Sequence, residues 1–329
     1  MTQNRNNNNN SNVIRNIVCA AVVALTAHTA QAQTQLKYSD FDSWCTRVVK
    51  ESKIIGGAMK TLQEIGPNME WPQNQPYTNQ GGSPWANSNI MARVAGITKT
   101  NQSVYREKRG NGYCARMTTH VEGVKVLGII NIHVLAAGSI YLGKMFEPIT
   151  SSKNPMAKLD YGIPYTEHPK AIQFDYKVQL SDQPDRVRRT GFSSVKKVPG
   201  KDMPNMEVLL QRRWEDEKGN IYARRIGTAI HRFSNSTADW VNGAQFEIHY
   251  GDITGESFYQ PYMNLLQGGP DQKYALNSKG KVVPVVEVEW GTASDTPTHL
   301  CMQFVSSYGG AYIGAEGTTL WLDNVKLVY

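Results

Sequence analysis

Alternation of hydrophobic and polar residues constrains the fold of this chain more than any other feature. Ile172, Phe174, Tyr176 and Val178 alternate with polar neighbours, which is the period-2 pattern of a strand with one buried face. Glycine, proline, asparagine and aspartate separate similar patterns at 90–96, 113–121, 128–135, 206–213, 221–230, 244–250, 282–290, 299–306 and 319–329. Many short strands with few helices predict an all-β chain that closes as a β-sandwich or barrel.

Helical patterns are scarce. Only residues 43–53 and 262–266 are helix candidates, and the first fits a strand equally well. The polar, glycine-containing segment 215–220 predicts a hairpin loop between the two strands that flank it. Two further polar segments, 67–89 and 148–169, are expected to be long loops, which are uncommon unless they are functional or pack as arms.

The first 32 residues have the pattern of a secretory signal peptide. Arg5 and Arg15 provide positive charge, an apolar run follows at 17–27, and Ala-Gln-Ala at 30–32 provides the small residues that a signal peptidase requires. The alternative is a buried helix of the folded domain. We therefore expect an exported protein that is periplasmic, displayed on the cell surface or secreted.

The remaining chain is expected to form one domain. Residues 33–329 predict a single β-sandwich, with 70–154 as a less typical N-terminal portion, and a two-domain split near residue 155 is the alternative. No membrane span is expected, because even the longest apolar stretch, 126–142, is interrupted by polar residues and glycine.

The charge balance is only mildly basic. The chain has 35 lysine and arginine residues against 28 acidic residues, and they are scattered, so no nucleic-acid partner is expected. Local groups occur at Arg186, Arg188 and Arg189 and at Lys196 and Lys197. A solvated surface and an anionic-ligand site are the two interpretations of each group.

Three cysteines follow the predicted leader. They are Cys45, Cys114 and Cys301, so at most one disulfide bond forms and one thiol remains. Export permits a bridge between Cys45 and Cys114, although their spacing does not establish it. Cys301 lies in a strand pattern and is expected to be a buried hydrophobic side chain.

Three passages in the second half resemble a known family. They are Gly-Ile-Pro-Tyr at 162–165 with Phe-Asp-Tyr-Lys at 174–177, then Leu-Leu-Gln at 209–211, then Leu-Asp-Asn-Val-Lys-Leu at 322–327. In this order they are similar to the putative carbohydrate metabolism domain of exported proteins from glycan-foraging bacteria.

The resemblance is strongest over 155–329 and weaker over 70–154. It implies a jelly-roll β-sandwich related to carbohydrate-binding modules, with a glycan as partner. It brings no set of catalytic residues, so the site must be sought among the side chains themselves.

Aromatic side chains in loops are the first candidates for carbohydrate binding, because a flat ring can pack against the apolar face of a sugar. Trp71, Tyr77 and Trp85 lie in the long polar loop, and Trp240 lies in a second loop. The alternative for the first three is a lid folded back over the edge of the core. The strand patterns place three other tryptophans in the core: Trp214, Trp290 and Trp321.

Paired carboxylates are the candidates for catalysis. Glu287 and Glu289 alternate with apolar residues, which predicts one strand face and a backbone separation of about 6.5 to 7 Å. An inverting glycoside hydrolase needs its two carboxylates at roughly such a separation, although ordinary solvated strand faces carry similar pairs. Glu247 and His249 form a comparable pair.

Asp323 in the last strand is a candidate ligand for a structural calcium ion, with Asp40 or Asp42 as further oxygen ligands. The alternative is that Asp323 caps a turn or bonds to a neighbouring strand. No other cofactor is required by any motif in the chain.

These observations favour an exported jelly-roll protein that binds a polysaccharide or oligosaccharide without catalysis. A glycoside hydrolase that uses paired carboxylates is one alternative. A structural or adhesion component of the cell envelope that recognises a protein is another.

Overall fold

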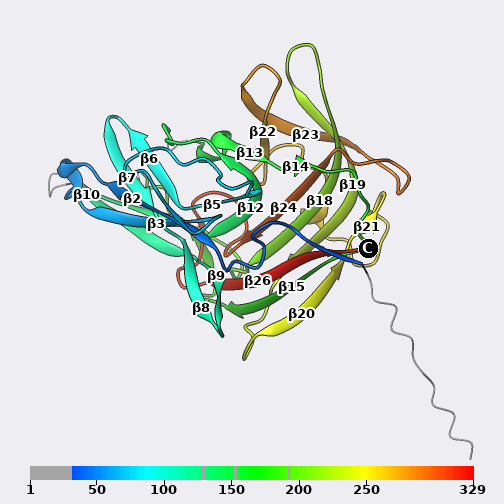
Figure 1. The fold of residues 1–329 in the computed structure, drawn as a ribbon, viewed down its shortest axis with the longest axis horizontal. Coiled ribbons are helices and arrows are strands. Elements are labelled where there is room, and N and C mark those ends of the chain that lie inside the picture. Colours follow the sequence, from blue (N-terminus) through cyan, green and yellow to red (C-terminus); the bar gives the residue numbers. More distant parts are fainter. Residues whose placement is uncertain (1–31, 127–129, 152–153, 192) are drawn as a thin grey trace, which may run out of the picture. The chain divides into compact units, whose positions relative to one another are not determined.

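The alternating segments form strands in the computed structural model, which describes residues 32–126, 130–151, 154–191 and 193–329. Ala32–Tyr329 forms one compact unit, whose strands belong to two large sheets and several small ones (Figure 1). The predicted signal peptide lies outside the described residues, apart from Ala32. In the described ranges no helix has the length and apolar character needed to span a membrane.

The smaller of the two large sheets has six strands in the order β20-β15-β26-β9-β8, with β1 added beside β26. Its strands are β1 (Gln33–Gln35), β8 (Val104–Arg109), β9 (Gly112–Thr118), β15 (Ala171–Gln179), β20 (Val241–Glu247) and β26 (Thr319–Val328).

The larger sheet has ten strands, with the main order β13-β12-β24-β18-β19-β23-β22. Its strands are β5 (Trp85–Asn87), β12 (Ser139–Met145), β13 (Leu159–Tyr161), β14 (Ile163–Pro164), β18 (Asn205–Glu215), β19 (Ile221–Arg232), β21 (His249–Tyr250), β22 (Tyr274–Leu276), β23 (Val282–Trp290) and β24 (His299–Val305).

Four small sheets complete the described structure: β3-β2-β4, β6-β7, β10-β11 and β17-β16-β25. Their strands are β2 (Trp44–Lys50), β3 (Met59–Ile65), β4 (Met69–Trp71), β6 (Ile90–Val94), β7 (Ile97–Asn101), β10 (His120–Val126), β11 (Ile130–Ala136), β16 (Arg186–Arg188), β17 (Lys196–Val198) and β25 (Ile313–Gly314). Three short 3₁₀ helices are also present: η1 (Lys53–Ile55), η2 (Pro155–Lys158) and η3 (Pro261–Met263).

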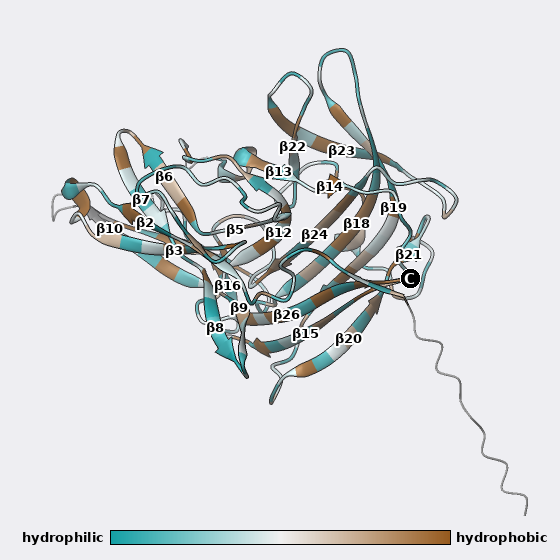
Figure 2. Cartoon of the chain, in the orientation of Figure 1, coloured by the Kyte–Doolittle hydropathy of each residue, from teal (hydrophilic) through white to brown (hydrophobic). Residues whose placement is uncertain are grey.

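The core lies between the two large sheets. Phe174 of β15 meets Phe304 of β24 edge to face, with ring centroids 5.1 Å apart, and stacks on Phe246 of β20 at 5.1 Å. Met206, from β18, belongs to the same buried cluster. Hydrophobic and hydrophilic residues alternate along strands of both large sheets (Figure 2). One apolar row of each sheet thus lies in a common core, and the fold is a jelly-roll β-sandwich, as the sequence predicts.

Most predicted strands are confirmed. The hairpin loop at 215–220 joins β18 and β19, which pair along their whole length. Residues 43–53 contain strand β2, and the other helix candidate, 262–266, overlaps only the 3₁₀ helix η3. The pattern at 244–250 is divided into β20 and β21, which pair with different sheets.

Gly143 marks a crowded point in β12. Its φ is +136°, and a Cβ atom there would collide with the carbonyl oxygen of Asp160 on the neighbouring strand. Its backbone N–H donates to the carbonyl oxygen of Pro84 at 2.8 Å. Only glycine fits this approach of three chain segments.

We expect Gly143→Ala to lower the free energy of unfolding by about 1 to 3 kcal/mol, because the added methyl group forces the strands apart. Urea denaturation measures this loss. Gly255→Ala is the matched control, since no atom lies within 4 Å of the position that a Cβ atom would take there, and its change is expected to stay within about 0.5 kcal/mol. Equal stability of the two variants would contradict the packing argument.

Candidate functional site

The outer face of the larger sheet forms the floor of a groove of about 570 Å³. Neighbouring strands pair in register, so opposite residues share a face. Two rows of side chains cross β12, β24, β18 and β19: Ser139, Val305, Asn205 and Arg232 in the first row, and Tyr141, Gln303, Glu207 and Ile230 in the second. All eight line the groove.

Strand β18 shows why the floor lies there. Met206 and Val208 point to the core of the sandwich, and period-2 alternation sends Asn205 and Glu207 to the other side. Both faces of this strand are covered, because residues Met206 to Gln211 are all buried. The sequence shows the apolar half of this pattern clearly and gives no sign that the polar half is covered too.

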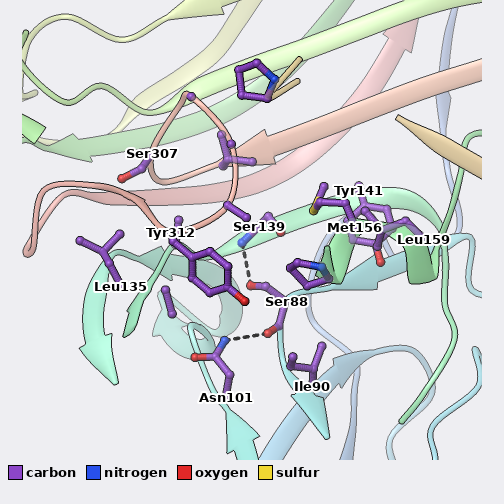
Figure 3. Close-up of a pocket in the computed structure, with 18 of the residues that line it drawn as sticks. Ser88, Ile90, Asn101, Leu135, Ser139, Tyr141, Met156, Leu159, Ser307 and Tyr312 are labelled. Atoms are coloured by element: carbon purple, nitrogen blue, oxygen red, sulfur yellow. Dashed lines mark hydrogen bonds between the residues drawn. The ribbon is translucent and has the colours of Figure 1, made fainter. Parts of the chain in front are cut away.

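The walls of the groove come from segments far apart in the chain. They include residues of β6, β7 and β11, the end of η2, the segment 262–273 and the loop 307–312. Figure 3 shows Tyr312 and Ser88 among the residues that line the groove. Two hydrogen bonds hold Ser88 in place: Asn101 donates to the Ser88 carbonyl at 2.9 Å, and Ser139 donates its N–H to the Ser88 hydroxyl at 2.9 Å.

Two glycines shape the loop at 307–312. Gly309 and Gly310 have φ values of +98° and +92°, which disfavour other residues. A Cβ atom at Gly310 would lie 2.8 Å from the carbonyl oxygen of Pro270, and one at Gly309 would lie 2.8 Å from Nη1 of Arg186. The glycines therefore let the loop pack tightly against both neighbours, with Tyr308 and Tyr312 in the wall of the groove.

A buried ion pair sits in the floor. Lys273 donates to Glu207 at 3.1 Å and to the side-chain oxygen of Gln303 at 2.5 Å. The hydroxyl of Tyr161 donates to Glu207 at 2.8 Å. Both charged side chains are about nine-tenths buried, so their charges must compensate each other.

Stacked side chains form one end of the groove. The guanidinium of Arg232 lies between two tyrosines, 3.8 Å from the ring centroid of Tyr262 and 3.9 Å from that of Tyr308. All three are half-buried. Such contacts are favourable because the ring face attracts a cation.

A second cavity of about 520 Å³ adjoins the groove and also has Arg232 and Tyr262 in its lining. It contains Glu247 and His249, the pair noted in the sequence. The His249 ring stacks on Phe258 with centroids 4.1 Å apart, and its Nδ1 lies 4.0 Å from Glu247. The two side chains are therefore neighbours, but the distance between them is long and the contact is open to solvent.

The predicted loop aromatics do not form an exposed platform. Trp85 has 0% exposure, and its indole N–H donates to the carbonyl oxygen of Lys37 at 3.1 Å. Tyr77 is buried, and Trp71 packs edge to face against it at 5.5 Å. The structure thus has the alternative arrangement, in which this loop folds back over the core. By contrast, Trp214, which the pattern places in the core, is 43% exposed.

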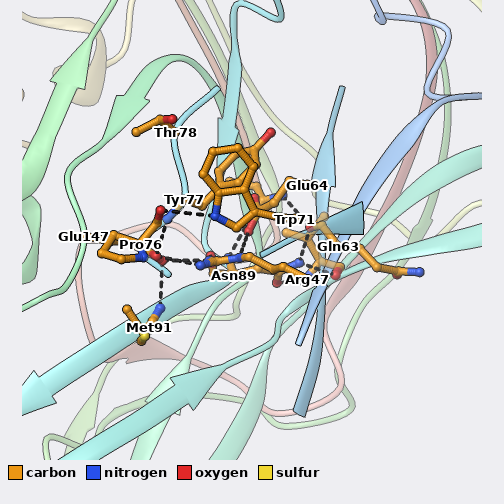
Figure 4. Close-up of polar contacts among 12 residues, drawn as sticks. Arg47, Gln63, Glu64, Trp71, Pro76, Tyr77, Thr78, Asn89, Met91 and Glu147 are labelled. Atoms are coloured by element: carbon orange, nitrogen blue, oxygen red, sulfur yellow. Dashed lines mark hydrogen bonds and ion pairs between the residues drawn. The ribbon is translucent and has the colours of Figure 1, made fainter. Parts of the chain in front are cut away.

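A buried polar network lies beneath Trp71 and Tyr77 (Figure 4). Arg47 donates from Nη1 and Nη2 to both carboxylate oxygens of Glu147, at 2.6 and 2.7 Å, and from Nε to Glu64 at 2.8 Å. Glu147 also accepts the backbone N–H groups of Tyr77 and Met91. One cation therefore serves two buried carboxylates.

Asp323 pairs with an arginine. Nη1 of Arg109 lies 2.5 Å from Asp323 and 2.9 Å from Asp175, and its guanidinium stacks on Trp240 at 3.8 Å. Burial raises the pKa of Asp323 to about 6, against the opposing effect of Arg109. Arg109 thus supplies a positive charge beside Asp323. The described residues contain no group of three or more His, Cys, Asp or Glu that could hold a metal.

Glu287 and Glu289 lie in different environments. The pairing of β19 with β23 shifts register between Ala223 and Arg224, so the expected common face is lost. Glu287 is fully buried and forms an ion pair with Arg225, whereas Glu289 is exposed and bonds to Arg224. The structure does not join them in one pocket.

All three cysteines of the described chain are free and buried. Burial raises the pKa of Cys45 to about 11 and that of Cys114 to about 12. These thiols are therefore held in their neutral, unreactive form.

Sequence reasoning missed the residues of the groove itself. Glu207 and Asn205 lie in a strand whose apolar residues drew attention, and Lys273 lies in a loop with no motif. One usable signal was the sequence Tyr-Gly-Gly-Ala-Tyr at 308–312, in which two aromatic residues flank a glycine turn.

The sandwich and its lateral groove together define a jelly-roll protein with a cavity on the outer face of one sheet. The chain belongs to the putative carbohydrate metabolism domain family, whose model matches residues 63–247. This range includes the motifs at 162–177 and 209–211, and of the eight residues in the two rows of the floor it lacks only Gln303 and Val305. The closing motif at 322–327 lies outside it.

No curated protein matches the chain. Among solved structures, the chain is similar to the crystal structure of a putative glycoside hydrolase from Bacteroides thetaiotaomicron, with 17% sequence identity and a TM-score of 0.44. The similarity covers 83% of this chain and 76% of the other.

The Arg47 network predicts a pH dependence of stability. Burial raises the pKa of Glu64 to about 8, against the opposing effect of Arg47. The unfolded pKa is about 4.3. A raised folded pKa stabilises the fold fully below the unfolded value and loses that contribution as pH rises through about 8.

We therefore expect the free energy of unfolding to be smaller at pH 8.5 than at pH 5.5, by an amount on the order of 2 kcal/mol. Glu64→Gln removes the titrating group and is expected to flatten this difference in urea titrations at both pH values. A wild-type stability that rises over the same interval, or an unchanged slope in the variant, would show that Glu64 does not hold the proton.

Proposed function

We propose that this protein binds a glycan in the groove on the outer face of its larger sheet, without hydrolysing it. Membership of a carbohydrate metabolism family supports the ligand class. The volume of about 570 Å³ lies within the range of small-molecule sites.

The observation that carries the proposal is the polar chemistry of the floor. The hydroxyl of Tyr141 and the side-chain oxygen of Asn205 are buried and have no hydrogen-bond partner among the described residues. Unpartnered buried polar atoms cost free energy. A ligand rich in hydroxyl groups offers them partners, while Tyr262 and Tyr312 in the walls provide aromatic surface.

Binding is favoured over catalysis by the state of the acidic residues. Glu207 is paired with Lys273. Although burial opposes it, hydrogen bonds from His120 and Lys99 hold the pKa of Glu122 at about 2. A general acid must carry a proton at working pH, and the low pKa of Glu122 keeps that carboxylate ionised.

The test is a screen of the purified protein against an array of neutral and acidic oligosaccharides, followed by calorimetry. We expect binding to at least one glycan. Tyr312→Ala and Tyr262→Ala are expected to weaken it about threefold to tenfold, because each removes an aromatic contact worth roughly 1 kcal/mol.

Trp71→Ala and Trp240→Ala are the matched controls, since neither residue lines the groove, and binding is expected to be unchanged. Retained fold is checked by circular dichroism. The proposal fails if no glycan binds, or if the Trp71 variant loses binding while both tyrosine variants keep it.

Export forms part of the proposal and rests on the predicted signal peptide. Strand β1 begins at Gln33, the first residue after the expected cleavage site. Mass spectrometry of the protein expressed in its host is expected to show an N-terminus at Gln33 in the periplasmic, surface or secreted fraction. An uncleaved chain in the cytoplasm would contradict this.

A further inference from the structure

The end of the groove at Tyr308 concentrates positive charge. Arg186 lies 3.8 Å from the centroid of the Tyr308 ring, and Arg232 lies 3.9 Å from the same centroid. Tyr262 adds the next ring, beside Arg232. Two guanidinium groups and two tyrosines therefore form one continuous stack.

Neither of these two arginines forms an ion pair with a carboxylate group in the described part of the chain. In the ranges that the structure describes, no ion pair involves Arg232, its guanidinium makes no hydrogen bond, and its buried Nε has no partner. The guanidinium of Arg186 donates to the backbone carbonyl oxygens of Tyr308 and Pro199, both at 3.3 Å. A partly buried charge without a counter-ion is costly.

The acidic residues near these arginines either bind other groups or make no direct contact with a guanidinium. Asp185 pairs with Lys197, and Asp202 accepts hydrogen bonds from Ser307 and from the backbone N–H of Ala315. Asp271 lines the groove and acts on Arg232 only through its electric field. Neither Arg232 nor Arg186 therefore has an acidic partner in direct contact among the described residues.

Arg232 also has the right neighbour for a sugar. It lies opposite Asn205 in the register of β18 and β19, and the unpartnered oxygen of Asn205 is an acceptor for a hydroxyl group. Both residues line the groove. An anionic group and a hydroxyl group on one ligand would thus satisfy two adjacent side chains of the floor.

We propose that the ligand is an anionic glycan, with a carboxylate or sulfate group bound by Arg232. This inference rests on the proposed glycan-binding function and specifies its ligand class. Arg186 is a positioning residue: it holds Tyr308 against Arg232 from behind and adds to the positive potential. Arginine suits this role because its planar donors match carboxylate and sulfate oxygens.

The experiment compares three sets of oligosaccharides of equal length by calorimetry: an oligouronate, its carboxyl-reduced neutral counterpart, and a sulfated oligosaccharide. We expect the wild-type protein to bind one of the charged sets at least about tenfold more tightly than the neutral one, the factor of one charge-assisted hydrogen bond. The affinity is expected to fall as sodium chloride is raised. If the oligouronate binds more tightly, the bound group is a carboxylate; if the sulfated oligosaccharide does, it is a sulfate.

Arg232→Gln is expected to remove the preference for the charged ligand and to leave the weaker neutral binding in place. Arg232→Lys keeps the charge and is expected to restore part of the preference. Arg188→Gln is the matched control: it removes an equal charge from an exposed strand position outside the groove, and the preference should remain.

Two outcomes would overturn the inference while leaving glycan binding intact: neutral ligands bound as tightly as charged ones, or an unchanged preference in Arg232→Gln. If the wild-type protein binds no glycan at all, the proposed function itself is refuted. Thermal denaturation of each variant shows whether a loss of binding follows from unfolding.

Discussion

The structure depends on a sheet that is covered on both sides. Strands β18 and β24 place one set of side chains in the sandwich core and the opposite set beneath the small sheets and loops. The inner set is apolar and provides most of the driving force for folding. The outer set includes polar side chains, and in the groove floor Lys273, Glu207 and Gln303 are partners for one another. The apolar core and the floor of the groove are thus formed by opposite faces of the same strands.

Local patterns in the sequence predict the sandwich well, because alternation depends on neighbours within one strand. The site could not be predicted equally well. Asn205 and Arg232 lie opposite each other in the β18–β19 hairpin, but Tyr141 of β12 and Tyr312 of a loop join them in the lining of the groove from distant parts of the chain. Trp85 was expected in an exposed loop, but the polar residues around it gave no sign that the N-terminal segment accepts its indole N–H and that Phe41 packs on it at 5.7 Å. The prediction that Glu287 and Glu289 share a strand face was wrong because the sequence of one strand does not reveal a shift in its pairing register.

Buried or half-buried contacts between an arginine and acidic side chains recur at the junctions between segments. Arg47 joins β2 to β3 and to the chain after β12, Arg225 joins β19 to β23, and Arg109 joins β8 to β15 and β26. Sequence spacing does not reveal such partners, because up to 214 residues separate them. A buried charge left alone is strongly destabilising, so a wrong pairing of these strands would carry a larger cost than the loss of apolar contact. We infer that these pairs help to select one arrangement of strands among several with similar apolar faces.

The position of Arg232 and Tyr262 in the lining of both cavities has a mechanical consequence. Arg232 stacks on both Tyr262 and Tyr308, so these side chains border the groove and the second cavity together. Side chains change rotamer far more readily than strands move. A change in the rotamer of Arg232 would therefore alter the lining of both cavities at once.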